Sequence, residues 1–317
     1  MKVTVILCTF NRCESLAKAL QSLAASVLPE SVKWEVLVVD NHSSDSTRQV
    51  VEGFCERWPG RFRYAFEATP GKSNALNRGI QEAQSDVLAF TDDDVAVDPA
   101  WLQNLTAHLD NGNWAGAGGR ILPNRPFSPP GWMPSRQRYA LAPLTIFDPK
   151  INDECLKDAP FGANMAFQRR VFEQYGNFRV DLGPGIGGDT PEKSEDTEFG
   201  HRLLNAGERI RYEPSAIVYH VLPAERVRQS YFLHWWFDKA RADVRAFGVS
   251  PDIKRFVAGI PLHLFRRLFM GFLRWMFTVE PSLRFERKLK LWAISGEMAE
   301  CYRQSQARKG RKLKAAR

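Results

Sequence analysis

The sequence predicts an α/β protein in which helices flank an open, mostly parallel sheet, with a helical extension at the C-terminus. Apolar strand-like runs alternate with amphipathic helical segments through about residues 1–120, a pattern typical of parallel sheets with right-handed crossovers. Polar clusters directly follow several of these runs. Beyond residue 225 the chain is rich in aromatic and basic residues, and its pattern is helical.

The chain opens on Val3–Cys8, a nearly continuous apolar run typical of a buried parallel strand. Asn11 is expected to cap the helix that follows. The core-facing residues of that helix are expected to be Leu16, Leu20, Leu23 and Val27. Further strands are predicted over 34–39, 62–66 and 86–91, and helices from Asp45, over 73–83 and after Asp98-Pro99.

Residues 121–190 are less regular and rich in Pro and Gly. A helix is then predicted over 195–206 with Gly207 as its stop, a strand over 211–221, and an aromatic helix over 231–247. We therefore expect the following organisation: one domain over 1–225 with halves of about 1–120 and 121–225, a helical extension over 226–302, and a disordered basic tail over 303–317.

Charge and cysteine content limit the possible functions. The net charge is +8, and the seven Lys and Arg residues of 303–317 supply +7 of it. A nucleic-acid-binding protein would carry such charge on its folded body, so no nucleic acid partner is expected. A basic tail suits anionic membrane lipids or simple solubility. The five cysteines include no CxxC pair, which indicates reduced thiols in a cytoplasmic protein rather than a disulfide or zinc framework.

The segment 256–279 is strongly apolar but contains Arg266, Arg267 and Arg274. Near a bilayer centre each arginine would cost roughly 2.5–3.5 kcal/mol, which opposes a spanning helix. On a helical wheel His263, Arg267 and Arg274 share one side, and apolar residues cover much of the other. Two interpretations stay open: a helix lying in the membrane interface and a helix packed on the main domain.

Polar residues follow three of the predicted strands. The clusters concerned are Thr9-Phe10-Asn11-Arg12 after the first strand, Asp40-Asn41 after the second, and Asp92-Asp93-Asp94 after the fourth. Ligands of such sheets bind beyond the carboxyl ends of the strands, so these clusters are expected to converge. Adjacent carboxylates repel one another and persist when a cation neutralises them. Oxygen ligands suit Mg²⁺ or Mn²⁺ bound together with substrate phosphates; the alternative is a solvated turn.

Three further features are less specific. Lys72 and Arg78 lie at and within a predicted helix start, where anions bind, although a capped surface helix has the same pattern. Asp196 follows the glycine-rich loop 183–189 and could take a proton from a sugar hydroxyl; the alternative is a carboxylate that only complements the helix dipole. His220 ends a predicted strand, and it is a structural residue unless that strand brings it to the aspartates.

Taken together, these residues resemble glycosyltransferase family 2, whose GT-A fold is a Rossmann-like sheet with flanking helices. The resemblance covers about residues 2–221. It rests on these motifs in this order: Val5–Arg12, Val38–Asn41 with Ser43-Ser44-Asp45, Asn74–Gly79, Asp92-Asp93-Asp94, Gly162–Met165, Glu195-Asp196 and Tyr219-His220.

The resemblance implies roles for matching positions. Asp92 would face the ribose or donor sugar, Asp94 would hold the metal with His220 as a further ligand, and Asp196 would be the base of an inverting transfer. Residues implied on the donor side are Thr9, Asn11, Arg12, Asp40 facing the base, Lys72, Asn77, Arg78 and Asp93. Residues expected on the acceptor side are Asn164, Gly187, Gly188, Asp189, Glu195 and Trp235.

The predicted function is transfer of a sugar from a nucleoside-diphosphate sugar to a hydroxyl of a lipid-linked or envelope glycan precursor. The enzyme is expected to be peripheral on the cytoplasmic face of the membrane. The chain has no clear QxxRW motif, which favours single transfer over polymerisation. One alternative is a metal-dependent sugar-phosphate nucleotidyltransferase, whose usual glycine-rich opening the segment Thr9–Arg12 lacks. Another is a non-catalytic nucleotide-sugar-binding membrane adaptor, which would require a broken metal or base position.

Overall fold

The computed structural model describes every residue except 111, 135–139, 150–153, 184–193 and 316–317, and it describes side chains as far as Lys309. The described residues belong to two compact units. The first comprises Met1–Pro126, Thr145–Gly187 and Glu195–Leu222. The second comprises Phe127–Leu144, Gly188–Ser194 and Pro223–Arg317.

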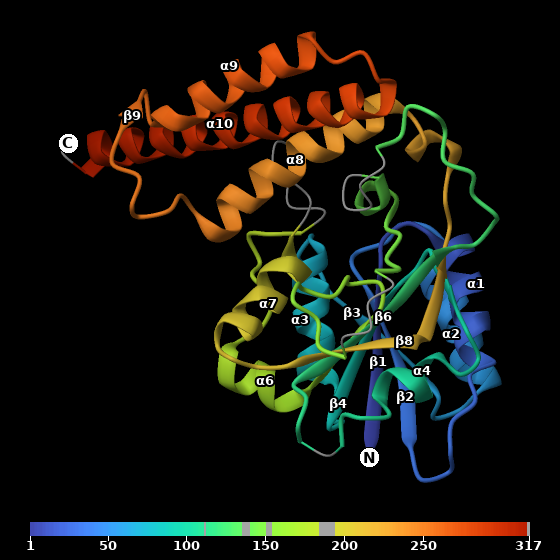
Figure 1. Cartoon of the computed structure of the whole chain (residues 1–317). Helices are drawn as coiled ribbons and strands as arrows, with labels where there is room; N and C mark the ends of the chain where they lie inside the picture. The colour runs from blue at the N-terminus through green and yellow to red at the C-terminus, as the bar shows by residue number, and fades with distance from the viewer. Residues whose placement is uncertain (111, 135–139, 150–153, 184–193, 316–317) are drawn as a thin grey trace. The chain divides into compact units, whose positions relative to one another are not determined.

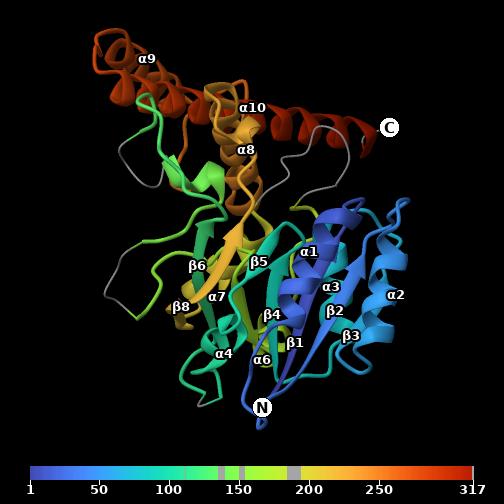
Figure 2. The ribbon, with the colours of Figure 1, turned by 90° about the vertical axis from the view of Figure 1, so that its right-hand side faces the viewer.

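The first unit is built on a sheet with the strand order β3-β2-β1-β4-β7-β6-β8-β5. Its parallel half consists of β1 (Lys2–Thr9), β2 (Lys33–Asp40), β3 (Phe62–Phe66) and β4 (Val87–Asp92). Figure 2 shows β1, β2 and β4 side by side. The other strands are β5 (Val95–Val97), β6 (Gly116–Pro123), β7 (Met165–Gln168) and β8 (Ile210–His220). Strand β7 runs antiparallel between β4 and β6, whereas β6 and β8 are parallel.

Alternation along β1 divides the core of this unit into two layers, because successive side chains of a strand point to opposite faces. Val3, Val5 and Leu7 pack under α1 (Cys13–Ala24), α2 (Thr47–Arg57) and α4 (Trp101–Thr106). Ile6 belongs to the opposite layer, beneath α3 (Lys72–Glu82), α6 (Arg169–Tyr175) and α7 (Glu195–Asn205). Figure 1 shows α1 and α2 on one side of the sheet and α3, α6 and α7 on the other. The predicted sheet with helices on both faces is thus confirmed.

Most predicted elements occur within a residue or two of their expected bounds, but the first helix differs at both ends. Asn11 does not cap it: the N-cap residue is Arg12, which makes no side-chain cap hydrogen bond, and the amide oxygen of Asn11 accepts from the backbone N–H of Ser44 at 2.7 Å. Asn11 has a φ of 51°, a left-handed conformation that Asn tolerates. Val27 lies beyond the end of α1 and is 65% exposed, so it is not part of the buried stripe.

Asn164 joins three elements from inside the first unit. Its amide oxygen accepts from the indole N–H of Trp101 at 2.8 Å. Its amide nitrogen donates to the carbonyls of Arg120 and Ala216 at 2.8 and 2.9 Å. The residue is 1% exposed. Its side chain therefore connects α4, β6 and β8 where the sheet changes from parallel to mixed.

The second unit is helical. Its elements are the 3-10 turns η1 (Ala142–Leu144) and η2 (Ala224–Arg226), the hairpin β9 (Phe256–Val257) and β10 (Ile260–Pro261), and the helices α8 (Gln229–Phe247), α9 (Leu262–Met276) and α10 (Pro281–Ala315). Trp132 packs edge-on against Phe232 and Phe285, with ring centroids 5.4 and 5.0 Å apart. Helices α8 and α10 approach closely at Gly296, where a Cβ would lie 2.2 Å from the carbonyl oxygen of Phe237.

Two expectations for the C-terminal third can be compared with this unit. The predicted helical extension is present, but the tail over 303–317 was expected to be disordered, and α10 continues through it to Ala315. The residues of this segment favour a helix, and the segment contains no proline. Its one glycine, Gly310, does not end α10. Among the described residues, no helix is both long and apolar enough to cross a membrane.

We expect Asn164→Ala to lower the free energy of unfolding by about 2–4 kcal/mol, because it leaves a buried indole N–H and two buried carbonyls without their partner. Denaturant unfolding at equilibrium measures this. Asn104→Ala is the control, since that exposed amide donates one hydrogen bond, to the carbonyl of Ser215; it should cost less than about 1 kcal/mol. Equal losses in the two variants would contradict the structural role of Asn164.

Candidate active site

Strand register brings the predicted polar clusters to one edge of the first unit. Thr9 pairs with Asp40 across β1 and β2, and Cys8 pairs with Asp92 across β1 and β4. All three strands are parallel and end at this edge. The convergence predicted from the sequence therefore follows from the register of three neighbouring strands.

The three adjacent aspartates have different surroundings. Asp93 turns inward, is 5% exposed and accepts a hydrogen bond from the hydroxyl of Thr9 at 2.7 Å. The guanidinium of Arg12 donates to Asp93 at 3.1 Å and to Asp94 at 3.3 Å. Burial raises the pKa of Asp93 to about 6, although the Thr9 hydroxyl and Arg12 oppose the shift. Arg12 and Thr9 thus hold Asp93 in place, while Asp92 and Asp94 stay more accessible.

Asp92 forms an ion pair with Lys72, the first residue of α3, with 2.6 Å between Nζ and Oδ1. The same ammonium lies 3.7 Å from the carboxylate of Glu195, the first residue of α7. The two carboxylates raise the pKa of Lys72 despite its burial, so the lysine stays charged. One cation from α3 therefore connects the end of β4 with the start of α7.

Pairing of β5 with β8 places His220 beside the aspartates. Val95 is the register partner of His220 in this antiparallel pair. The imidazole Nε2 lies 3.4 Å from Oδ1 of Asp94. A carboxylate and an imidazole at this separation are a chemically suitable pair of ligands for a divalent cation completed by phosphate oxygens. No group of three or more His, Cys, Asp and Glu residues suited to a metal occurs in the described part of the chain.

Asp196 lies in the first turn of α7, as predicted. One carboxylate oxygen accepts from the backbone N–H of Gly162 at 2.8 Å. The other accepts from the backbone N–H of Thr197 at 2.6 Å. Ser194, the residue before α7, has a φ of 79°, a strained conformation for a non-glycine residue. Backbone donors thus fix the orientation of the Asp196 carboxylate.

Asp40 stands at the end of β2 within a second group of polar contacts. Its carboxylate accepts from the phenol of Tyr64 and from the backbone N–H of Ser43, both at 2.9 Å. Burial and the bond to Asp40 raise the pKa of Tyr64 to about 12, so the phenol remains a donor. Next to it, the amide of Asn41 accepts from the backbone N–H of Gly71 at 2.8 Å and donates to the carbonyl of Thr69 at 2.7 Å. This amide holds the loop that leads into Lys72.

Comparison with known proteins shows the family of the chain. The family model described as glycosyl transferase family 2 matches residues 4–176, more than half of the chain. The chain belongs to glycosyl transferase family 2. It is 30% identical over 230 residues to the succinoglycan biosynthesis protein ExoM of Rhizobium meliloti, covering 71% of this chain and 69% of that protein. It is 27% identical to the glucosyl-dolichyl phosphate glucuronosyltransferase of Haloferax volcanii, covering 70% of each.

Solved glycosyltransferases share the fold. The mannosyltransferase PcManGT from Pyrobaculum calidifontis, solved in complex with GDP-Man and Mn²⁺, has a TM-score of 0.57 at 20% identity and covers 94% of this chain and 73% of its own. Residues 1–349 of TarS from Staphylococcus aureus give a TM-score of 0.52 at 17% identity, covering 98% of this chain and 92% of that one. Both likenesses confirm the predicted GT-A fold.

Several residues predicted for this family 2 glycosyltransferase contact other parts of the chain. Asn77 exchanges two hydrogen bonds with the backbone of Phe178, and Arg78 pairs with Glu82 one turn along α3. Asn164 contacts the interior partners described above. Trp235 belongs to the second unit, where it packs against Trp236 with centroids 5.0 Å apart. Gly187, Gly188 and Asp189 lie outside the described residues.

The sequence assigned no individual role to three contributors to the site, although Asn41 and Gly162 lie in motifs that it singled out. Tyr64 has no local signal, because only the pairing of β2 with β3 brings it to Asp40. Asn41 stands next to Asp40 in the sequence, and its role as a connector between loops depends on the left-handed Gly71, with a φ of 121°. Gly162 is used through its backbone N–H, which any residue type has. A Cβ at Gly162 would approach the Asp196 carboxylate to 3.3 Å, and that is the one local reason for a glycine there.

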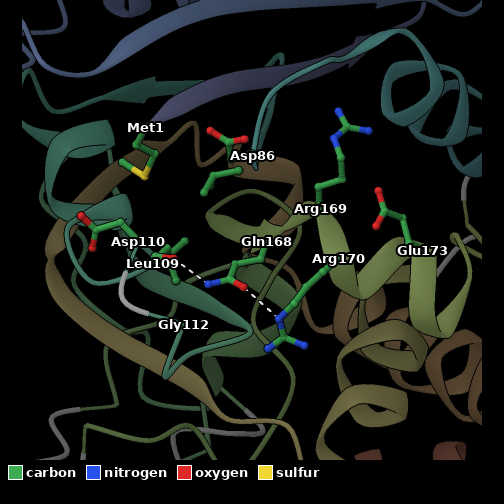
Figure 3. Close-up of a pocket in the computed structure, with 10 residues that line it drawn as sticks. Met1, Asp86, Leu109, Asp110, Gly112, Gln168, Arg169, Arg170 and Glu173 are labelled. Carbon is green, nitrogen blue, oxygen red and sulfur yellow. Dashed lines mark hydrogen bonds between the residues drawn. The ribbon is translucent and has the colours of Figure 1, made fainter.

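A separate pocket of the glycosyltransferase lies at the opposite edge of the sheet. Figure 3 shows Met1 and Asp86, which precede β1 and β4, facing Gln168 at the end of β7. The side chain of Gln168 donates to the carbonyl of Leu109 and accepts from Arg170. None of the predicted donor, metal or base residues lines this pocket. It is therefore distinct from the carboxyl edge where those residues meet.

We expect Asp93→Asn to change how stability depends on pH. The folded protein keeps the pKa of Asp93 near 6, above the ordinary value of 3.8. Between these two values the folded state binds more protons than the unfolded state, so stability falls as pH rises. The wild type should lose up to about 3 kcal/mol across this window relative to the variant.

Urea unfolding from pH 4 to pH 7 in the presence of a chelator measures this difference. Glu52→Gln, at an exposed position of α2, is the control and should follow the wild-type profile. Parallel profiles for wild type and Asp93→Asn would show that Asp93 is not titrating in this range.

Proposed function

We propose that this glycosyltransferase moves a sugar from a nucleoside-diphosphate sugar to a hydroxyl of a glycan or lipid-linked acceptor, with inversion at the anomeric carbon. The observation that carries the proposal is the set of carboxylates at one edge of the sheet. Asp94 lies beside His220, and Asp92 lies beside Lys72. Asp196 directly follows Glu195, which the same lysine contacts.

The nucleotide would bind along the ends of β1 and β2. Asp40 is oriented by Tyr64 and Ser43, so it can accept an N–H of the base in a fixed direction. Arg12 is half-exposed and can contact a phosphate from its position beside Asp93 and Asp94. Thr9 and Asn11 would position the residues around the nucleotide, because Thr9 donates to Asp93 and Asn11 accepts from the loop after β2. Asp92 would receive hydroxyls of the ribose or donor sugar.

Asp94 and His220 would hold Mn²⁺ or Mg²⁺. Their Oδ1 and Nε2 atoms are 3.4 Å apart, and a hard divalent cation bound by few protein ligands completes its coordination with substrate phosphates and water. The PcManGT structure with GDP-Man and Mn²⁺ supports this choice. When bound, the ion offsets the negative charge that builds up on the departing diphosphate.

Asp196 would act as the general base. The N–H groups of Gly162 and Thr197 orient its carboxylate, and a positioned carboxylate can take the proton of the acceptor hydroxyl as its oxygen attacks. The oxygen forms a bond to the anomeric carbon while the bond to the diphosphate breaks on the opposite side. The proton ends on Asp196, and the bonding electrons leave with the diphosphate.

Family membership favours sugar transfer over the nucleotidyltransferase alternative. A non-catalytic adaptor would be expected to lack the metal ligand or the base, but Asp94 and Asp196 are both present. The names of the relatives support a class of acceptor: one acts in succinoglycan biosynthesis, and another is named for glucosyl-dolichyl phosphate. We infer a lipid-linked or envelope glycan precursor as acceptor for this chain, and a single transfer per acceptor.

We propose further that α9 lies on an anionic membrane surface, at the cytoplasmic face. Of its residues only Leu264 is buried, which does not fit a helix packed into a core. The apolar face of α9 is defined by its exposed large apolar residues, Leu262, Phe265, Phe269, Met270, Phe272 and Met276. Arg266 and Arg267 are also exposed on this helix. Aromatic residues beside arginines suit the interface of an anionic bilayer.

Two substitutions should separate binding from chemistry. Asp94→Ala should weaken metal-dependent binding of the nucleotide-sugar at least tenfold, because the cation loses a carboxylate ligand. Asp196→Asn should bind the donor as the wild type does and lose at least a hundredfold in transfer, because an amide cannot take the proton. The donor is first found by screening nucleotide-sugars with Mn²⁺ or Mg²⁺ for nucleoside diphosphate release. Unchanged affinity in Asp94→Ala, or normal turnover in Asp196→Asn, would refute the respective role.

The membrane proposal has its own test. Phe265→Ser, Phe269→Ser and Phe272→Ser combined should reduce co-sedimentation with vesicles containing phosphatidylglycerol, because they remove exposed apolar area from the apolar face of α9. Val27→Ser, which changes an exposed apolar residue of the first unit, is the matched control and should bind like the wild type. Binding that is equal in all three proteins, or insensitive to phosphatidylglycerol, would rule out this surface.

A further inference from the structure

Lys72 is shared unequally between two carboxylates that come from opposite sides of the proposed reaction. Its ammonium is 2.6 Å from Asp92, on the donor side, and 3.7 Å from Glu195, which precedes the proposed base. The shorter distance is a charge-assisted hydrogen bond, and the longer one is an electrostatic contact without a hydrogen bond. Within the described part of the chain, Lys72 is the one basic side chain within 4 Å of Glu195.

Glu195 is enclosed on its other sides. Its side chain is 7% exposed. The left-handed Gly183 packs against it, and a Cβ there would lie 3.3 Å from the Glu195 carboxyl group. Behind Gly183, the hydroxyl of Ser73 donates to the carbonyl of Leu182 at 2.7 Å and holds this segment against α3. The carboxylate of Glu195 thus has little access to water and faces a mobile cation on a four-carbon stem.

We propose that Glu195 is a positioning residue that receives the ammonium of Lys72 when a donor sugar occupies Asp92, so that donor binding prepares the neighbouring base Asp196. This inference rests on the proposed function, since it takes Asp92 as the contact to the donor sugar. When a sugar hydroxyl donates to Asp92, fewer lone pairs of the Asp92 carboxylate remain to accept from the ammonium of Lys72. Glu195, already 3.7 Å away, is the acceptor that it can reach by a change of side-chain torsion.

The electrostatics support a change of charge at this step. Burial and the adjacent Asp196 raise the pKa of Glu195 to about 7, while Lys72 opposes the shift. The other groups that face Glu195 are Asp92 from β4 and the thiol of Cys8 from β1, whose own pKa burial raises, so it stays neutral. A closer ammonium stabilises the ionised carboxylate. Glu195 then releases its proton, and the ammonium comes to lie at the residue that precedes the proposed base Asp196.

Proton release on donor binding tests this directly. The screen covers UDP-glucose, UDP-N-acetylglucosamine, UDP-glucuronate and GDP-mannose. The one that binds is titrated by calorimetry at pH 7 with Mn²⁺, in buffers of different ionisation enthalpy. Because Glu195 titrates near pH 7, the wild type should release up to about half a proton per donor bound. Glu195→Gln should bind the donor and lose this release. Asp93 also titrates near this range, but it is retained in the variant, so the difference isolates Glu195.

Glu198→Gln is the matched control, because Glu198 lies in the same first turn but pairs with Arg202 at 2.6 Å; it should release as many protons as the wild type. If Glu195→Gln does not fold, Glu195→Ala gives the same expectation, since no titrating carboxylate is then present at this position. Equal release in wild type and Glu195→Gln, or none in the wild type, overturns the inference and leaves the proposed function standing. Failure of every nucleotide-sugar to bind the wild type overturns both.

Discussion

The structure of the site depends on how five carboxylates are kept close together at one edge of a sheet. They belong to Asp92, Asp93, Asp94, Glu195 and Asp196. Two cations, Arg12 and Lys72, lie among them. Arg12 comes from the segment after β1, the neighbour of β4, and Lys72 comes from the segment after β3, at the far side of the parallel half. Without the order β3-β2-β1-β4, neither side chain would reach the aspartates that end β4. Charge compensation inside the protein therefore accompanies the burial of Asp93, while Asp92 and Asp94 remain partly exposed.

Rigid connections between loops support this charge arrangement. Asn41 holds the loop before Lys72, and Asn11 joins the loop after β1 to the loop after β2. Asn164 joins strands β6 and β8 to α4 inside the first unit. The pairing of β5 with β8 places His220 beside Asp94. Two of these amide side chains thus connect loops at the carboxyl ends of the strands, and the third connects two strands and a helix inside the first unit. Relatives of family 2 and solved GT-A enzymes share the sheet that these amides connect.

The second unit has a different physical character. Its interior is formed by aromatic residues between α8, α10 and the segment containing Trp132. Its charges are also arranged by pairing: Glu300, with a fully buried side chain, contacts Arg241, Arg245 and Arg303. Helix α9, in contrast, leaves most of its large apolar residues exposed. The second unit thus pairs one buried carboxylate with three arginines and leaves the large apolar residues of one helix exposed.

The sequence by itself determined the class of fold, the positions of nearly all strands and helices of the first unit, and the convergence of Asp40, Asp92–Asp94 and Thr9–Arg12. These features follow from periodicity and from the rule that parallel strands end at a common edge. Only the tertiary structure decided what each polar side chain contacts. Asn11 looked like a cap and is a connector, and Asn77 and Asn164 looked like site residues and bind backbone groups. The physical reason is that an amide or a carboxylate satisfies whatever donor the packing brings within about 3 Å, and that distance depends on contacts far apart in sequence. The division of Lys72 between Asp92 and Glu195 is such a case, since 20 and 123 residues of chain separate them.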